Sequence, residues 1–135
     1  MTRRATRSLV LLLSAIISAP LFADGSPPVQ VGVAKVDVTP RGPVVLAGYG
    51  GRTTEHEGID TRLWARAIVI GDAQPVAMVV LDNSGVPGDV SAQLARRLAQ
   101  YDISADRLVV AATHTHNAPT LVGYASIVWA GRTTP

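Results

Sequence analysis

The sequence LVVAATHTHNAP, residues 108–119, joins an apolar run to two histidines and a polar loop. Its apolar part, residues 108–112, predicts a strand, and the near-continuous hydrophobicity favours a sheet that is covered on both faces. A similar run at residues 76–81 predicts a second strand of this kind, which ends at Asp82. In open α/β sheets, ligands bind beyond the carboxyl ends of parallel strands. Asp82 and the two histidines are therefore the first candidates for a functional site.

A helix is expected between these two strands. Residues 89–100 carry valine, leucine and alanine side chains at helical spacing. A strand, a helix and a strand in this order form a β-α-β unit, in which the two strands are parallel. Two further strands are expected at residues 29–38 and 63–70, on either side of a long glycine-rich loop at residues 41–61. The predicted fold class is α/β, with a mixed sheet that contains one β-α-β unit.

Length and composition indicate one packed globular domain. The chain has 135 residues, of which 47% are hydrophobic and 16% charged. Three of its twelve basic residues lie within the first seven positions, so the remaining nine face ten acidic groups. The body of the chain is therefore nearly neutral, and without a basic stripe we expect no nucleic-acid partner. The chain has no cysteine, so any metal site must use nitrogen and oxygen ligands.

The amino terminus is typical of an export signal. Residues 1–8 are cationic, residues 9–19 are apolar or small, and Ala23 offers a small residue at the cleavage point. The apolar run is about half of the roughly 20 residues that a membrane-spanning helix needs. We therefore expect a cleavable signal peptide over residues 1–23, a linker over residues 24–28, and a secreted or periplasmic protein.

His114 and His116 are candidate metal ligands. Residues two apart in an extended strand point the same way, so both imidazoles are expected to project from one face. Two such rings can reach one Zn²⁺ ion at about 2.0–2.1 Å, provided that further ligands converge. The residue pattern alone leaves two other interpretations open. The pair can be ordinary hydrogen-bonded histidines at a strand end, or a group that acts in acid–base chemistry.

Three other polar residues have both a functional and a structural interpretation. Asp82 can accept a hydrogen bond that fixes a histidine tautomer, or it can form a turn or a helix cap. His56, between two glutamates, is interpreted as a solvated loop histidine rather than a ligand. Arg66 lies in an apolar strand and needs an acidic partner if it is buried. That partner would make a structural ion pair or anchor the 41–61 loop.

Five short motifs, in this order along the chain, resemble the start of the neutral/alkaline non-lysosomal ceramidase family. They are VGVAKVDVTP at 31–40, LAGY at 46–49, GI at 58–59 with LWARA at 63–67, VVLD at 79–82, and ATHTH at 112–116. Together they cover most of the chain between residues 29 and 119. On this resemblance, residues 29–135 are the incomplete amino-terminal part of a larger catalytic domain.

The resemblance implies zinc-dependent hydrolysis of the amide bond of ceramide, which releases sphingosine and a fatty acid. It assigns His114 as a zinc ligand and His116 as a catalytic residue that faces the same pocket. The family's other zinc ligands (a histidine, a glutamate and a tyrosine) and its proposed serine nucleophile come from later parts of a longer chain. The implied partner is a lipid-like amide substrate, with peripheral contact to a membrane. The oligomeric state is not fixed by the sequence.

The chain also departs from the family pattern. The histidine motif continues as NAPTL at residues 117–121, where relatives commonly have serine or alanine followed by glycine and proline. Asp60 stands where relatives often carry histidine. A divergent branch that acts on another amide or ester is one interpretation. The alternative to an enzyme is a non-catalytic exported α/β module that binds a ligand or partner through the 41–61 loop.

Overall fold

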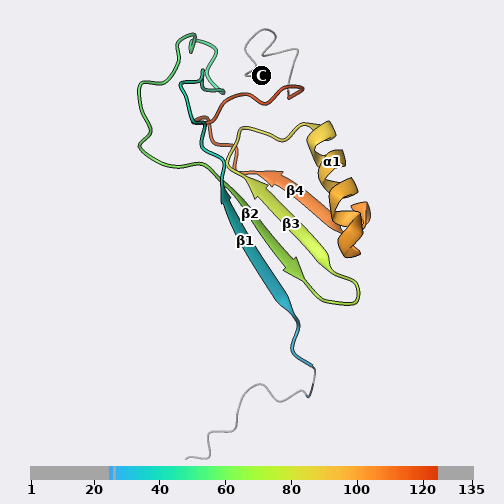
Figure 1. Ribbon diagram of the computed structural model, residues 1–135. Helices are drawn as coiled ribbons and strands as arrows, with labels where there is room; N and C mark the ends of the chain where they lie inside the picture. The colour runs from blue at the N-terminus through green and yellow to red at the C-terminus, as the bar shows by residue number, and fades with distance from the viewer. Residues whose placement is uncertain (1–24, 26, 125–135) are drawn as a thin grey trace, which may run out of the picture.

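The computed structural model describes residue 25 and residues 27–124, which form a four-stranded mixed sheet with one helix against it (Figure 1). The predicted α/β class is therefore confirmed. In chain order the elements are β1 (Val31–Asp37), β2 (Trp64–Ile70), β3 (Val76–Leu81), α1 (Gly88–Leu98), two 3-10 turns (Ala99–Tyr101 and Ala105–Arg107) and β4 (Leu108–Ala112). The predicted signal peptide lies outside the described residues. Within the described part, no helix has the length and apolar character needed to cross a membrane.

The strands lie side by side in chain order, from β1 to β4. β1 pairs with β2, and β2 with β3, in antiparallel fashion, whereas β3 and β4 are parallel. The parallel pair and α1 make up the predicted β-α-β unit (Figure 1). This topology brings the carboxyl ends of β3 and β4 to the same edge of the sheet, where Leu81 pairs with Ala112.

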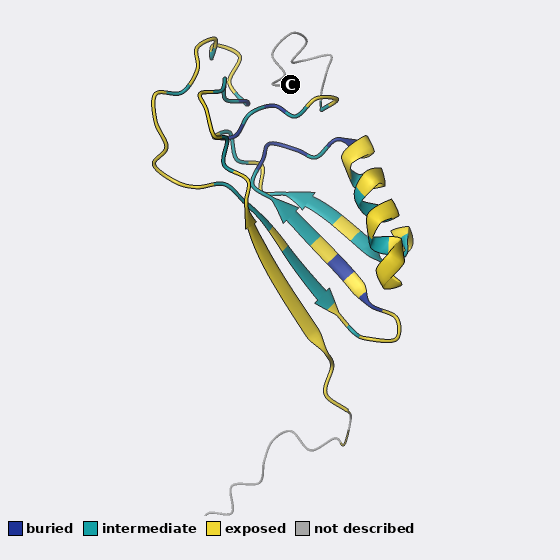
Figure 2. Ribbon diagram, viewed as in Figure 1, coloured by how far each residue is buried: buried dark blue, intermediate teal, exposed yellow. Residues whose placement is uncertain are grey.

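Whereas β1 is exposed along its whole length, helix α1 lies against one face of the sheet at β3 and β4. Its alanines line a shallow cleft together with Leu108 and Val110 of β4, and the register places Ala77 of β3 on that same face. Ala77 is 1% exposed, whereas Met78, which points to the other face, is 43% exposed. The expectation that these strands are covered on both faces is thus wrong for the described residues. We call the uncovered side the open face (Figure 2).

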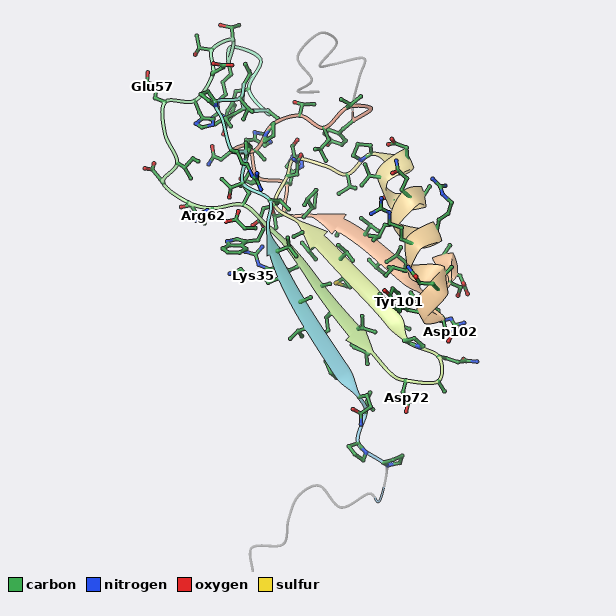
Figure 3. The ribbon with its side chains drawn as sticks, in the orientation of Figure 1. Lys35, Glu57, Arg62, Asp72, Tyr101 and Asp102 are labelled. Atoms are coloured by element: carbon green, nitrogen blue, oxygen red, sulfur yellow. The ribbon has the colours of Figure 1, made fainter. Side chains whose placement is uncertain are left out.

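The end of β1 is tied to the chain that enters β2. The carboxylate of Asp37 accepts hydrogen bonds from the backbone N–H of Thr39 at 2.9 Å and from Arg62 at 2.7 Å. Hydrogen bonding to Thr39, helped by Arg62, lowers the pKa of Asp37 to about 2. In Figure 3, Arg62 lies at the end of β1 nearest the long loop that contains Glu57, and Asp72 marks the turn at the opposite end of the sheet.

The most deeply buried loops lie beyond the carboxyl ends of β3 and β4. Residues 44–56, 82–87 and 113–124 pack together there, and we call them the loop layer (Figures 1 and 2). Leu46 and Pro119 form a β-bridge, and the Ala47 N–H donates to the Ala118 carbonyl at 2.8 Å. Short antiparallel pairing between distant segments therefore gives these loops a defined path over the end of the sheet.

Candidate functional site

Both predicted site histidines lie in the loop layer. β4 ends at Ala112, and His114 has a φ of 60°, in the left-handed region that few non-glycine residues adopt. The premise that an extended strand carries both histidines is therefore wrong. Their rings are nevertheless close, with centroids 5.1 Å apart and planes inclined by 65°. The two rings therefore come close together at a left-handed turn and not through the alternation of side chains along a strand.

The ring of His114 is oriented by a backbone carbonyl. Its Nδ1 lies 2.7 Å from the carbonyl oxygen of Ser84. Because a carbonyl can only accept, Nδ1 must donate, so the neutral ring carries its hydrogen on Nδ1 and its lone pair on Nε2. The hydroxyl of Tyr124 donates to the same carbonyl at 3.1 Å. An imidazole whose other nitrogen is held in this way is the form that binds metal ions in proteins.

Ser84 is held in place by buried polar contacts. Asn83 and Ser84 are both buried, and the Asn83 amide donates to the Pro119 carbonyl at 3.0 Å. The Ser84 hydroxyl donates in turn to the Asn83 side-chain oxygen at 3.3 Å. Gly85 lets the Tyr124 ring approach, because a Cβ at this position would lie 2.7 Å or less from ring atoms. The acceptor for His114 is thus part of a hydrogen-bonded turn after β3.

Among the described residues, packing contacts position the ring of His116, and none of these residues forms a hydrogen bond to it. The Tyr49 ring meets it edge to face, with centroids 4.9 Å apart. On the same side lies Gly48, which has a φ of 100° and at which a Cβ would lie 2.6 Å from the Cβ of His116 and still nearer its ring. Only glycine satisfies both the backbone conformation and the close approach. Arg52 donates to the carbonyl of His116 and lies over the Tyr49 ring.

Asp82 pairs with Arg66 and not with a site histidine. Its carboxylate accepts from Arg66 and from the backbone N–H of Trp64, each at 2.9 Å. Asp82 pairs with Arg66, which lies on the open face, whereas the acceptor for the His114 ring is the Ser84 carbonyl. Its proposed role as the histidine acceptor is therefore wrong. The predicted ion pair of Arg66 with an acidic residue is confirmed.

His56 stays within its own loop. Its Nδ1 lies 3.0 Å from the carbonyl oxygen of Gly58, which agrees with the interpretation as a loop histidine. It lines a cavity of about 320 Å³ between the 41–61 loop and residues 117–119, and neither His114 nor His116 lines that cavity. Within the described residues, no three histidine, aspartate or glutamate side chains are grouped closely enough to hold a metal ion. The described residues therefore bring together two imidazoles, one ligand fewer than a catalytic zinc ion generally takes from the protein.

Several residues that shape the site were not found from the sequence. Tyr49, Arg52 and Tyr124 contact or flank the histidines, and Gly48 and Gly85 make room for them. The LAGY motif at 46–49 and the long polar 41–61 loop drew attention to Gly48, Tyr49 and Arg52, but neither linked these residues to the histidines. Tyr124 comes late in the chain and carries no local pattern that links it to Ser84.

The chain is similar to a family of known proteins. The profile of the neutral/alkaline non-lysosomal ceramidase amino-terminal region matches residues 29–130, which confirms the resemblance of the five motifs. The neutral ceramidase of Pseudomonas aeruginosa is 34% identical over 119 residues, which cover 81% of this chain and 18% of that protein. The neutral ceramidase of Drosophila pseudoobscura pseudoobscura is 32% identical over 120 residues, which cover 83% and 17%.

Two solved structures share the fold. The crystal structure of neutral ceramidase from Pseudomonas aeruginosa aligns with a TM-score of 0.58 and 32% identity over 69% of this chain and 16% of that one. A structure described as ceramidase complexed with C2 aligns with a TM-score of 0.62 and 31% identity over 75% and 17%. The chain thus spans less than a fifth of the length of the relatives it matches.

Proposed function

Because this chain belongs to the neutral/alkaline non-lysosomal ceramidase family, we propose that it is the amino-terminal part of a zinc-dependent amide hydrolase. The observation that carries the proposal is the hydrogen bond between Nδ1 of His114 and the Ser84 carbonyl. It leaves the Nε2 lone pair of an exposed imidazole available for a cation. The neighbouring His116 ring places a second titratable nitrogen at the same site.

His114 would hold the zinc ion, and Ser84 and Tyr124 would keep its ring in the ligating orientation. Bound zinc polarises a carbonyl and lowers the pKa of a bound water to roughly 7. Catalytic zinc generally takes three protein ligands. The remaining ligands would therefore come from polypeptide outside the described residues, which accords with the fraction of the relatives that this chain spans.

His116 would move a proton during cleavage of the amide bond. Its ring lies beside that of His114, and histidine is the side chain that most often transfers protons in enzymes. Hydrolysis adds water across the C–N bond, so the leaving amine must gain a proton, and a histidine next to the reacting carbonyl can supply it. Tyr49 and Gly48 hold the ring in place for this role.

The proposed substrate is a lipid amide of the ceramide type. The matched relatives are named neutral ceramidases, and hydrolysis of an N-acylsphingosine would yield sphingosine and a fatty acid. Such a substrate resides in membranes, so peripheral contact with a lipid surface would be required. Export through the signal at residues 1–23 would place the enzyme in the periplasm or outside the cell.

Zinc titration of the full chain, followed by NMR of the histidine rings, tests the metal site. The chain has three histidines, so each ring signal can be assigned. We expect zinc to shift the ring signals of both His114 and His116, with the larger shift at His114, while the ring signals of His56 stay unchanged. His114→Ala should weaken the apparent zinc affinity at least tenfold, and His56→Ala is the matched control. Equal zinc affinity in His114→Ala and the unaltered chain would contradict the proposal.

A second experiment addresses the substrate. Release of fatty acid from a short-chain ceramide in mixed micelles is measured for a polypeptide that carries this chain with the remaining family region. Activity that disappears in His114→Ala and persists in His56→Ala supports the amide hydrolase. Zinc binding at His114 without any ceramide turnover would point to another amide or ester as the substrate.

One observation favours the alternative of a non-catalytic binding module. The cavity of about 320 Å³ is lined largely by the 41–61 loop and lies apart from the histidine pair. If neither His114 nor His116 responds to zinc, this cavity becomes the leading candidate for ligand binding. The exported α/β chain would then bind a ligand or partner through that loop.

A further inference from the structure

Arg52 connects two segments of the loop layer, residues 44–56 and residues 113–124. Its Nη1 donates to the carbonyl of Ala47 at 3.2 Å and also to the carbonyl of His116. Its guanidinium carbon lies 4.7 Å from the centroid of the Tyr49 ring. One side chain therefore contacts the chain before the glycine-rich turn, the aromatic residue of that turn, and the backbone of a site histidine that lies 64 positions away along the sequence.

We propose that Arg52 is a positioning residue that fixes the orientation of the His116 ring beside His114. This inference rests on the proposed function, because it assigns Arg52 a role in holding the proton-moving group of that site. The residue does not touch the reacting atoms. It acts through His116 and Tyr49.

The contacts of Arg52 differ from those of the other paired arginines. Arg62 and Arg66 form ion pairs with Asp37 and Asp82. Within residues 27–124, Arg52 has no carboxylate within ion-pair distance, and both acceptors of its guanidinium are main-chain carbonyls. A guanidinium stays charged at all relevant pH values, and its hydrogen bonds are charge-assisted. Its contribution is therefore to align two backbone segments rather than to neutralise an acid.

Arg52 acts on the His116 ring through two contacts, one with the His116 backbone and one with the neighbouring Tyr49 ring. The hydrogen bond to the His116 carbonyl holds the backbone from which the ring projects. The guanidinium also lies over Tyr49, and the Tyr49 ring meets the edge of His116 at 4.9 Å. Tyr49 is 58% exposed, and its carbonyl also accepts from the backbone N–H of Arg52 at 3.0 Å. Removing the guanidinium would remove the hydrogen bond to the His116 backbone and the contact with the Tyr49 ring together.

The test is NMR of the full 135-residue chain without metal, comparing Arg52→Ala and Arg52→Lys with Arg96→Ala. Arg96 is an exposed residue of α1 and serves as the matched control. In Arg52→Ala we expect the cross-relaxation between the Tyr49 and His116 rings to fall at least threefold. The Nδ1–H signal of His114 should persist, because its acceptor is Ser84. Arg52→Lys, which keeps a charged donor, should restore part of the lost signal.

Two outcomes would overturn the inference. One is an unchanged Tyr49–His116 signal in Arg52→Ala. The other is loss of the strand signals together with the ring contact, which would make Arg52 a general support of the fold. The zinc titration separates this inference from the proposed function, because the ring contact is measured without metal. Loss of the contact in Arg52→Ala with no zinc response in the unaltered chain would leave the positioning role intact and contradict zinc binding by His114 in this chain.

Discussion

The loop layer and the sheet differ in a way that reverses the usual pattern. Loops ordinarily lie exposed around a buried sheet. Here Ala118 in the loop layer is 0% exposed and Thr120 2%, whereas Val33 in the middle of β1 is 80% exposed. The loop layer thus contains several of the most buried described residues, while the open face of the sheet stays accessible. Substitutions in the loop layer should therefore lower stability more than substitutions on the open face.

Gly48→Ala should show the largest effect. The position has a φ of 100°, and the added Cβ would lie 2.6 Å from the Cβ of His116 and nearer still to its ring. A left-handed conformation costs a non-glycine residue about 1–2 kcal/mol, and overpacking adds about 1–3 kcal/mol. We expect the free energy of unfolding, measured by urea denaturation, to fall by about 3 kcal/mol.

Gly42→Ala is the matched control for this substitution. A Cβ at Gly42 meets no atom within 4 Å, and its φ is not in the left-handed region. Its free energy of unfolding should change by less than about 0.5 kcal/mol. If both variants lost the same stability, the loop layer would not be packed around His116 as described.

Asn83→Ala should cause the second-largest loss of stability. The buried Asn83 amide donates to the Pro119 carbonyl, and its oxygen accepts from the Ser84 hydroxyl. Truncation leaves buried polar groups without partners, which costs about 1–3 kcal/mol. We expect a loss of about 2 kcal/mol in urea denaturation, together with weakening of the His114 Nδ1–H signal, because Ser84 is no longer held.

Asn117→Ala is the corresponding control. Asn117 is exposed, and the hydrogen bond recorded for it uses its backbone N–H and the Thr115 hydroxyl. Its truncation should leave both stability and the His114 signal nearly unchanged. An Asn83→Ala variant that kept the His114 signal at full strength would show that the turn after β3 does not orient this histidine.

The sheet was predictable from the sequence, whereas the loop layer was not. Apolar runs and helical spacing report local geometry, so β3, α1 and β4 were located within a few residues. The pairing of His114 with His116 was predicted, but from a strand geometry that the left-handed His114 does not have. A positive φ at a histidine leaves no mark in a single sequence.

The contacts around the histidines join positions that are far apart in the chain. Ser84 and His114 are 30 residues apart, and Arg52 and His116 are 64 apart. Such contacts depend on the path of two long loops, and neither periodicity nor spacing encodes that path. Asp82 shows the same limit, because its place after β3 was predicted correctly but its partner was not. To predict the partner of Asp82, one would have to know on which face of the sheet its side chain lies.

Val33→Thr should show the smallest effect of the set. Threonine has nearly the same shape as valine and an equally good strand propensity, and its hydroxyl remains hydrated at a position that is 80% exposed. The free energy of unfolding should therefore change by less than about 0.5 kcal/mol. Ala77→Leu on the helix-covered face is the contrast, since overpacking there should cost about 1–3 kcal/mol. If Val33→Thr lost as much stability as Ala77→Leu, the open face would have to be covered in solution, and the contrast between loop layer and sheet would fail.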